Sequence, residues 1–113
     1  MAIIEMIGRP DSRPCVVARG RLTNEDEGRL LARVLTSRHV DVVVDLCEID
    51  EVTVEGCTAI KNVAEYMDKD QTMVVVYVPD REATRPLERS GITDDGRIVL
   101  VAASPSRRIS LEV

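Results

Sequence analysis

The side chains best suited to chemistry gather between residues 45 and 57. The carboxylates of this stretch are Asp45, Glu48, Asp50, Glu51 and Glu55. A hard cation such as Ca²⁺ needs oxygen ligands that converge on one point at about 2.0–2.6 Å, and the spacing of these residues matches no known calcium-binding loop. We therefore expect a solvated acidic rim, without a metal site or a cofactor.

Two further side chains are candidates for catalysis. Cys57 would be a nucleophile if it lay at a helix N-terminus, where the pKa of a thiol falls. However, Cys57, Ile60, Ala64 and Met67 recur at offsets of three and four residues, which is typical of one buried helix face. His39 is the only histidine, so a histidine-dependent triad has no second candidate, and its place between a helix and a strand favours a capping role. We expect no enzymatic activity.

The acidic stretch lies between an expected strand and an expected helix. Residues 42–44 are three valines, which favour a buried strand, and the series that begins at Cys57 indicates the helix. Thr53 is suited to cap this helix, a contribution of about 1 kcal/mol, and Glu55 would gain about 0.3–1 kcal/mol near the positive end of the helix dipole. Residues 53–56 are therefore either a purely structural helix start or an exposed docking surface.

Apolar runs elsewhere are short enough for strands. They are residues 3–7, 15–19, 73–78 and 97–102. The first two should form a hairpin around the turn-rich residues 8–14. The run at 73–78 is continuous, like that at 42–44, and this pattern is typical of strands covered on both faces in a parallel sheet.

Two more helices are expected. The first begins with Thr23 as its cap, followed by residues that are favourable in a first helical turn, and its apolar face is formed by Leu30, Leu31, Val34 and Leu35. The second lies within residues 80–90, and its regular part begins near Thr84 because Pro86 is tolerated only in a first turn. A last turn or two could follow the cap-like pair Ser104-Pro105.

The second of these helices carries a series of basic side chains. Arg81, Arg85 and Arg89 recur every four residues, so they share one face of the helix. Such a face could meet an acidic partner, but it is more often simply solvated, and we expect the solvated face.

These elements together predict an α/β fold. A length of 113 residues suits a single domain, which we assign to residues 1–113. We expect a central sheet that is mixed but mostly parallel, with about five strands and three to four helices.

The central residues resemble the signature of STAS domains, a family that includes anti-sigma factor antagonists and the tails of sulphate transporters. The residues that carry the likeness are Val-Val-Val-Asp-Leu at 42–46, Ile49, Val52, Gly56 and Ile60, with Gly20, Leu22, Gly91 and Ile92 at matching places farther out. The resemblance extends over residues 3–103 and implies a STAS-like fold.

The family's characteristic turn is Asp-Ser-Ser-Gly, and its first serine is the phosphorylation switch of the antagonists. Here Thr53 stands in place of the aspartate, Val54 of the phospho-acceptor serine, Glu55 of the second serine and Gly56 of the glycine. The resemblance therefore implies the scaffold without the acceptor, although Thr53 is an adjacent hydroxyl that a kinase could use. Glu55 is a weak substitute for a phosphate, which carries a charge of about −1.5 to −2 and three acceptor oxygens.

The resemblance also implies a function. It predicts a regulator of transcription that binds a protein through residues 53–56 and through the neighbouring Leu22, Thr23 and Asn24. The partner would be an anti-sigma factor of the serine-kinase type. With Val54 at the switch position, the protein would be a constitutive antagonist, a decoy or a member of another assembly. The alternative is a cytoplasmic STAS accessory subunit of a membrane transporter or of its ATPase.

Composition excludes several other classes of function. A formal net charge of −5, two tyrosines and no tryptophan or phenylalanine argue against nucleic-acid binding. The sequence has no glycine-rich phosphate loop, no apolar window near the ~18 residues of a membrane span and no signal-peptide pattern, so we expect a cytoplasmic protein. Cys15, Cys47 and Cys57 lie in or beside apolar runs without Cys-x-x-Cys spacing, which favours buried free thiols.

Overall fold

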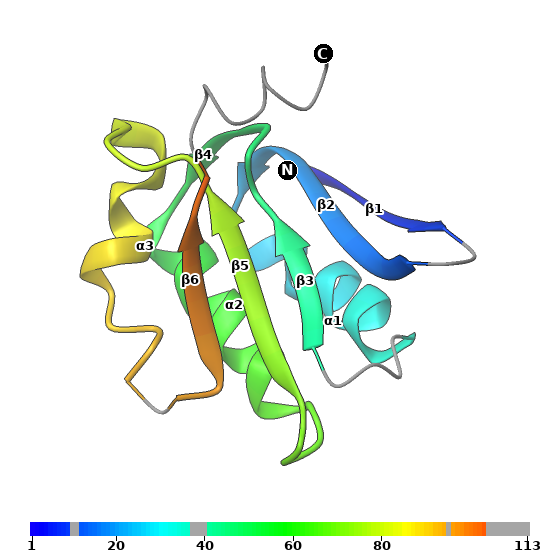
Figure 1. The fold of residues 1–113 in the computed structure, drawn as a ribbon. Coiled ribbons are helices and arrows are strands. Elements are labelled where there is room, and N and C mark those ends of the chain that lie inside the picture. Colours follow the sequence, from blue (N-terminus) through cyan, green and yellow to red (C-terminus); the bar gives the residue numbers. More distant parts are fainter. Residues whose placement is uncertain (10–11, 37–40, 95, 104–113) are drawn as a thin grey trace.

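The structure is a computed structural model that describes residues 1–9, 12–36, 41–94 and 96–103 (Figure 1). In chain order its elements are β1 (Ala2–Arg9), β2 (Ser12–Leu22), the 3₁₀ helix η1 (Asn24–Asp26), α1 (Glu27–Thr36), β3 (Asp41–Asp45), β4 (Ile49–Val52), α2 (Val54–Glu65), β5 (Thr72–Tyr77), the 3₁₀ helix η2 (Glu82–Thr84), α3 (Arg85–Arg89) and β6 (Ile98–Ala102). His39 and the expected cap at Ser104-Pro105 lie outside the described residues.

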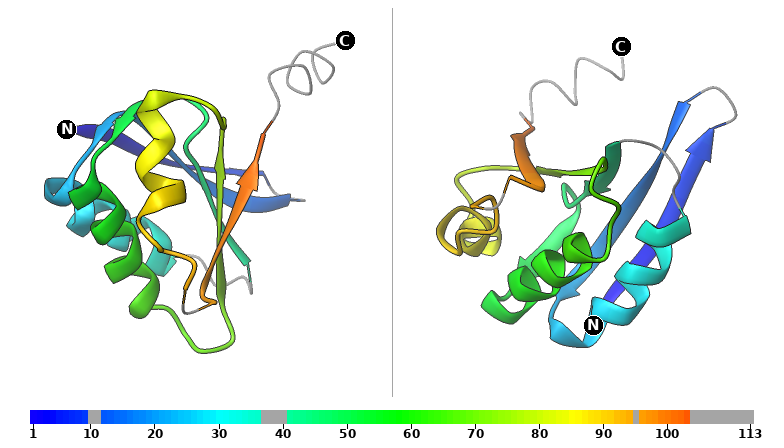
Figure 2. Two further views of the ribbon diagram at one scale, coloured as in Figure 1. Left: turned by 90° about the vertical axis from the view of Figure 1, so that its left-hand side faces the viewer. Right: turned by 90° about the horizontal axis from the view of Figure 1, so that it is seen from below.

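The strands form one mixed sheet in the order β1–β2–β3–β5–β6, and β4 pairs with β2 beyond the end of β3. The β1–β2 pair is antiparallel, whereas β2–β3, β2–β4, β3–β5 and β5–β6 are parallel. Helices α1, α2 and α3 lie on the same face of this sheet (Figure 2). The predicted α/β class with a mixed, mostly parallel sheet is therefore confirmed.

The core lies between the sheet and these helices. In β3, Val42 and Val44 are fully buried, while Val43 between them is only partly buried. β5 alternates in the same way over Thr72–Tyr77. The continuous apolar runs predict cover on both faces, but in the part of the chain that the structure describes the helices cover one face. Side chains on the other face therefore stay partly exposed.

The hairpin of β1 and β2 is longer than its sequence predicts. The expected turn at residues 8–14 is largely strand, because pairing continues as far as Arg9 and Ser12. The greater length of β2 has a further consequence. Residues 15–17 pair with β3 and residues 20–22 pair with β4, so a single strand supports two successive neighbours.

Among the strands in the described residues, β4 is the one that the sequence does not predict. Ile49 and Val52 are buried, but the two residues between them are both exposed, so the alternation that marks a half-buried strand is missing. The cause is a shift in register: Gly20 pairs with Ile49, and the next residue, Arg21, pairs with Glu51. Asp50 is therefore an extra residue with no partner in β2, and this irregularity breaks the period-two pattern.

Candidate docking site at the start of α2

Thr53 fixes the first turn of α2 to the end of β2. Its backbone N–H donates to the carbonyl oxygen of Leu22 at 3.1 Å. Its hydroxyl donates to the same oxygen at 3.1 Å and accepts from the N–H of Gly56 at 2.9 Å. The expected helix cap is confirmed. The hydroxyl is therefore engaged both as a donor and as an acceptor.

Gly56 allows α2 to lie this close to β2. A Cβ atom at this position would lie 2.3 Å from the carbonyl oxygen of Leu22 and 2.9 Å from its carbonyl carbon. Both atoms belong to the backbone, so no side-chain rotation could relieve the overlap. Close approach of two backbones, and not an unusual backbone angle, explains the glycine here.

The neighbouring loop is held by a capping box. The Thr23 hydroxyl accepts from the N–H of Glu25 at 3.2 Å, and the Asp26 carboxylate accepts from the N–H of Thr23 at 2.9 Å. The predicted cap at Thr23 is confirmed. Asp26 is not among the residues predicted for this site, although the Thr-x-x-Asp spacing is close to the Ser/Thr-x-x-Glu signature of such a box.

Asp26 is fully buried and joins three elements. It also accepts from the N–H of Ala2 in β1 at 3.1 Å and pairs with Arg29 in α1. Burial by itself raises the pKa of Asp26, but the hydrogen bonds from Thr23, Ala2 and Arg29 outweigh it and hold this pKa below the usual 3.8. An ionised carboxylate therefore ties β1, η1 and α1 together at neutral pH.

The seven predicted contact residues differ in their exposure. The structure brings the loop and the helix start together through the Thr53–Leu22 hydrogen bonds. The side chain of Leu22 is fully buried and Gly56 is buried as well, so both support the site from beneath. Val54 is 63% exposed, and Glu55 and Asn24 are also exposed. We call Asn24, Val54 and Glu55 the docking face, because a partner could touch these side chains directly.

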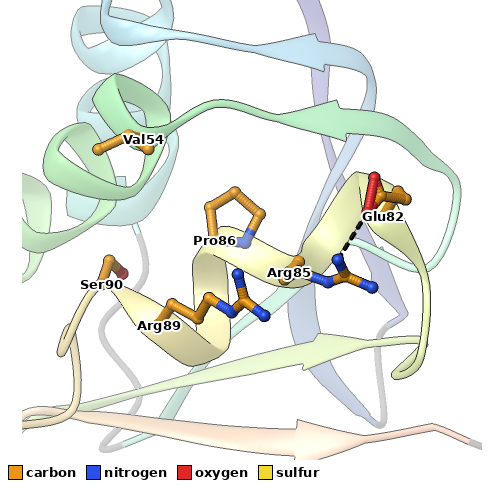
Figure 3. A pocket seen from close by; sticks show the side chains of 6 residues that line it. All are labelled: Val54, Glu82, Arg85, Pro86, Arg89 and Ser90. Atoms are coloured by element: carbon orange, nitrogen blue, oxygen red, sulfur yellow. Dashed lines mark ion pairs between the residues drawn. The ribbon is translucent and has the colours of Figure 1, made fainter.

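A groove of about 430 Å³ lies on the α3 side of Val54 (Figure 3). Its lining residues are Val54, Glu82, Arg85, Pro86, Arg89 and Ser90. The arginines of this region were predicted to lie on a solvated helix face, but Arg85 and Arg89 share a groove with Val54. Arg81 has a different role, because its guanidinium donates to the carbonyl oxygen of Ile49 in β4 at 3.4 Å.

The thiols are not activated by the helix start. Burial raises the pKa of Cys57, and a hydrogen bond from Ser90 offsets this only in part. Burial, with the charge of Asp45 nearby, raises the pKa of Cys15 to about 11. Cys57 is fully buried as predicted, whereas Cys15 and Cys47 are only partly buried, which corrects the expectation of three buried thiols.

Part of the acidic rim is neutralised by β2. Glu48 pairs with Arg19 at 3.2 Å, and Glu51 pairs with Arg21 at 2.7 Å. Within the described ranges, no three His, Cys, Asp or Glu side chains converge to hold a metal ion. No helix among these residues has the length and apolar character that a membrane span requires.

Comparisons with known proteins show a likeness in structure. The sequence matches no family model, and no curated protein matches it. The fold is similar to that of an anti-sigma factor antagonist from Mycobacterium paratuberculosis, at 15% sequence identity and a TM-score of 0.66, over 98% of this chain and 93% of that chain.

Two further structures support the same assignment. One is the anti-sigma factor antagonist SpoIIAA in its unphosphorylated form, at 13% identity and a TM-score of 0.54, over 99% of this chain and 97% of that chain. The other is an uncharacterized protein with a SpoIIAA-like fold from Shewanella loihica, at 18% identity and a TM-score of 0.51, over 98% of this chain and 91% of that chain. The chain has a SpoIIAA-like α/β fold, and the STAS-like fold implied by the sequence is confirmed.

Proposed function

We propose that this STAS-like domain is a non-enzymatic regulatory module that binds a protein partner through its docking face. One observation carries the proposal: Val54, an apolar side chain, is 63% exposed on a helix start that is rigidly attached to the sheet. The fully buried core of a protein–protein interface is more apolar than the rest of the protein surface, so an exposed apolar side chain held on the sheet is suited to that core. The similarity in fold to anti-sigma factor antagonists favours an anti-sigma factor as the partner.

We further propose that phosphorylation does not control this module at residues 53 and 54. Val54 has no hydroxyl, and the hydroxyl of Thr53 already donates to Leu22 and accepts from Gly56. A phosphate on Thr53 would remove the donated hydrogen and place negative charge beside a carbonyl oxygen. Glu55 instead gives the docking face a constant negative charge, so binding would be constitutive.

Affinity capture from a lysate of the source organism tests the proposal. The baits are the full chain, its Glu55→Lys variant and a matched control, Arg33→Glu. Arg33 is exposed in the last turn of α1, so both variants place a charge at the unfavourable end of a helix, at a similar cost of about 0.3–1 kcal/mol. Circular dichroism verifies that each bait is folded.

The expected result is a partner that the wild-type and Arg33→Glu baits retain equally. Calorimetry with that partner should give an affinity at least tenfold lower for Glu55→Lys, which corresponds to about 1.4 kcal/mol. The reverse pattern, with binding lost in Arg33→Glu and kept in Glu55→Lys, would place the interface away from the docking face and refute the proposal.

A further inference from the structure

The groove beside Val54 combines apolar walls with positive charge. Val54 and Pro86 supply the apolar surface, and Figure 3 shows the Pro86 ring on the side of α3 that faces α2. Arg85 pairs with Glu82 at 2.7 Å, whereas Arg89 forms no ion pair with any residue that the structure describes. Because the chain as a whole has a net charge of −5, this cationic groove is a local feature and not a result of composition.

Arg85 remains available to a ligand although it forms an ion pair with Glu82. In the Arg85–Glu82 pair, the side chain of Arg85 is 49% exposed and that of Glu82 is 83% exposed. An ion pair this exposed to solvent adds little to stability, so Arg85 can exchange Glu82 for a carboxylate of a partner at small cost. Arg89 needs no exchange. Both guanidinium groups can therefore form the paired hydrogen bonds that arginine makes to carboxylates.

Buried side chains and hydrogen bonds hold the groove in shape. Leu87 in α3 and Ile92 just after it are buried in the core. Thr84 donates to the carbonyl oxygen of Val78 at 2.9 Å, and Arg81 donates to the carbonyl oxygen of Ile49 in β4 at 3.4 Å. The segment that carries α3 is thus fixed to the sheet, as α2 is fixed through Thr53. A ligand would find the groove already formed, which lowers the entropic cost of binding.

We propose that this groove binds an acidic segment of the protein partner. An apolar side chain of the segment lies against Val54 and Pro86, and its flanking carboxylates bind Arg85 and Arg89. A volume of about 430 Å³ admits a few side chains, being near the low end of the range of about 300–1,000 Å³ for small-molecule pockets. The inference rests on the proposed function and extends the docking face from α2 to α3, with charge complementarity as the basis for the choice of occupant.

Three short synthetic peptides test the chemistry of the occupant. They share the same leucines and differ only in having glutamate, glutamine or lysine at all other positions. Fluorescence anisotropy with the full-length chain gives the affinities, and amide chemical shifts of the ¹⁵N-labelled chain give the site. The glutamate peptide should bind at least tenfold more tightly than the glutamine peptide, shift the amides of Val54 and of residues 82–90, and bind less tightly as salt is raised. The lysine peptide should not bind.

Arg89→Glu and Arg33→Glu form the matched pair of variants. Both replace an exposed arginine in the last turn of a helix, but only Arg89 lines the groove. Binding of the glutamate peptide should fall at least tenfold in Arg89→Glu and stay within twofold in Arg33→Glu. Arg89→Gln, which removes the charge without reversing it, should show an intermediate loss and serves if Arg89→Glu does not fold.

Several outcomes would overturn the inference. They are equal binding of the glutamate and lysine peptides, shifts confined to other elements, equal losses in the two arginine variants, and displacement of the peptide by inorganic phosphate at equal concentration, which would indicate a simple anion site. Failure here is distinct from failure of the proposed function. The capture experiment depends on Glu55→Lys, which leaves both groove arginines in place, and the peptide experiment needs no natural partner.

Discussion

Replacing Gly56 with alanine should weaken the contact on which the docking face is built. The new Cβ would lie 2.3 Å from the carbonyl oxygen of Leu22, more than 1 Å closer than the 3.4 Å at which ordinary contact begins. α2 would have to move away from β2, because the Cβ is held in place by the α2 backbone and the atoms that it meets belong to the β2 backbone. The move would stretch the two hydrogen bonds from Thr53 to Leu22, each 3.1 Å long.

Three contributions determine how much Gly56→Ala changes the free energy of unfolding. Overpacking of this kind costs about 1–3 kcal/mol, and each weakened hydrogen bond costs about 0.5–1.5 kcal/mol. The higher helix propensity of alanine offsets at most about 1 kcal/mol of this loss of stability. We expect Gly56→Ala to lower the free energy of unfolding by about 3 kcal/mol, which corresponds to a fall in Tm of about 12 °C or more for a domain of this size.

Gly28→Ala is the matched control. Gly28 also lies near the start of a helix, α1, but a Cβ atom there would meet nothing within 4 Å. This variant should gain about 0.5–1 kcal/mol from helix propensity alone. Urea unfolding followed by circular dichroism measures both variants. If Gly56→Ala proves as stable as the wild type, or if the two variants shift stability in the same direction, the close approach of α2 to β2 is not what requires glycine.

Three further predictions concern single side chains. Incubation with a serine kinase and ATP should leave Thr53 and position 54 unmodified in phosphopeptide mass spectrometry, whereas Val54→Ser should provide an acceptor; stoichiometric phosphate on Thr53 would contradict the loss of the switch. Because the pKa of Asp26 is lower in the folded chain than in the unfolded chain, its stabilisation is present above about pH 4 and is lost as the pH falls through the folded-state pKa. Asp26→Asn should therefore cost about 1–3 kcal/mol at pH 7, and its urea midpoint should approach that of the wild type in acid; a constant difference at every pH would refute this. A thiol reagent at pH 8 should label Cys47 before Cys57, because Cys57 is fully buried and its thiol has a raised pKa. Rapid labelling of Cys57 in the native protein would instead indicate a reactive, nucleophilic thiol.

Local sequence patterns were sufficient for the helix caps and for most of the sheet. Thr23 and Thr53 are hydroxyl residues directly before apolar periodic segments, and both act as caps. β4 was not predicted, because the extra residue Asp50 removes the alternation by which a half-buried strand is recognised. The predicted strands of the β1–β2 hairpin are too short, because the polar and turn-favouring residues at their ends also pair with each other.

The candidate site was predictable only in part. The resemblance located residues 53–56, but it could not tell which side chains face outward, since burial of Leu22 and Gly56 depends on how closely α2 approaches β2. The groove depends on the distance between α2 and α3, which no short-range pattern encodes. A four-residue spacing places Arg85 and Arg89 on one side of a helix without indicating what lies opposite.

The attachment of Thr53 to Leu22 also couples partner binding to folding. These residues are 31 positions apart in the sequence, so their hydrogen bonds form only once β2, β4 and α2 have assembled. A partner that recognises the docking face would therefore bind the native chain and not an unfolded one. At a concentration one hundred times its Kd, such a partner would add about 2.7 kcal/mol to the free energy of unfolding. That gain is similar in size to the loss expected for Gly56→Ala, so a sufficiently abundant partner would keep even a chain with this substitution folded.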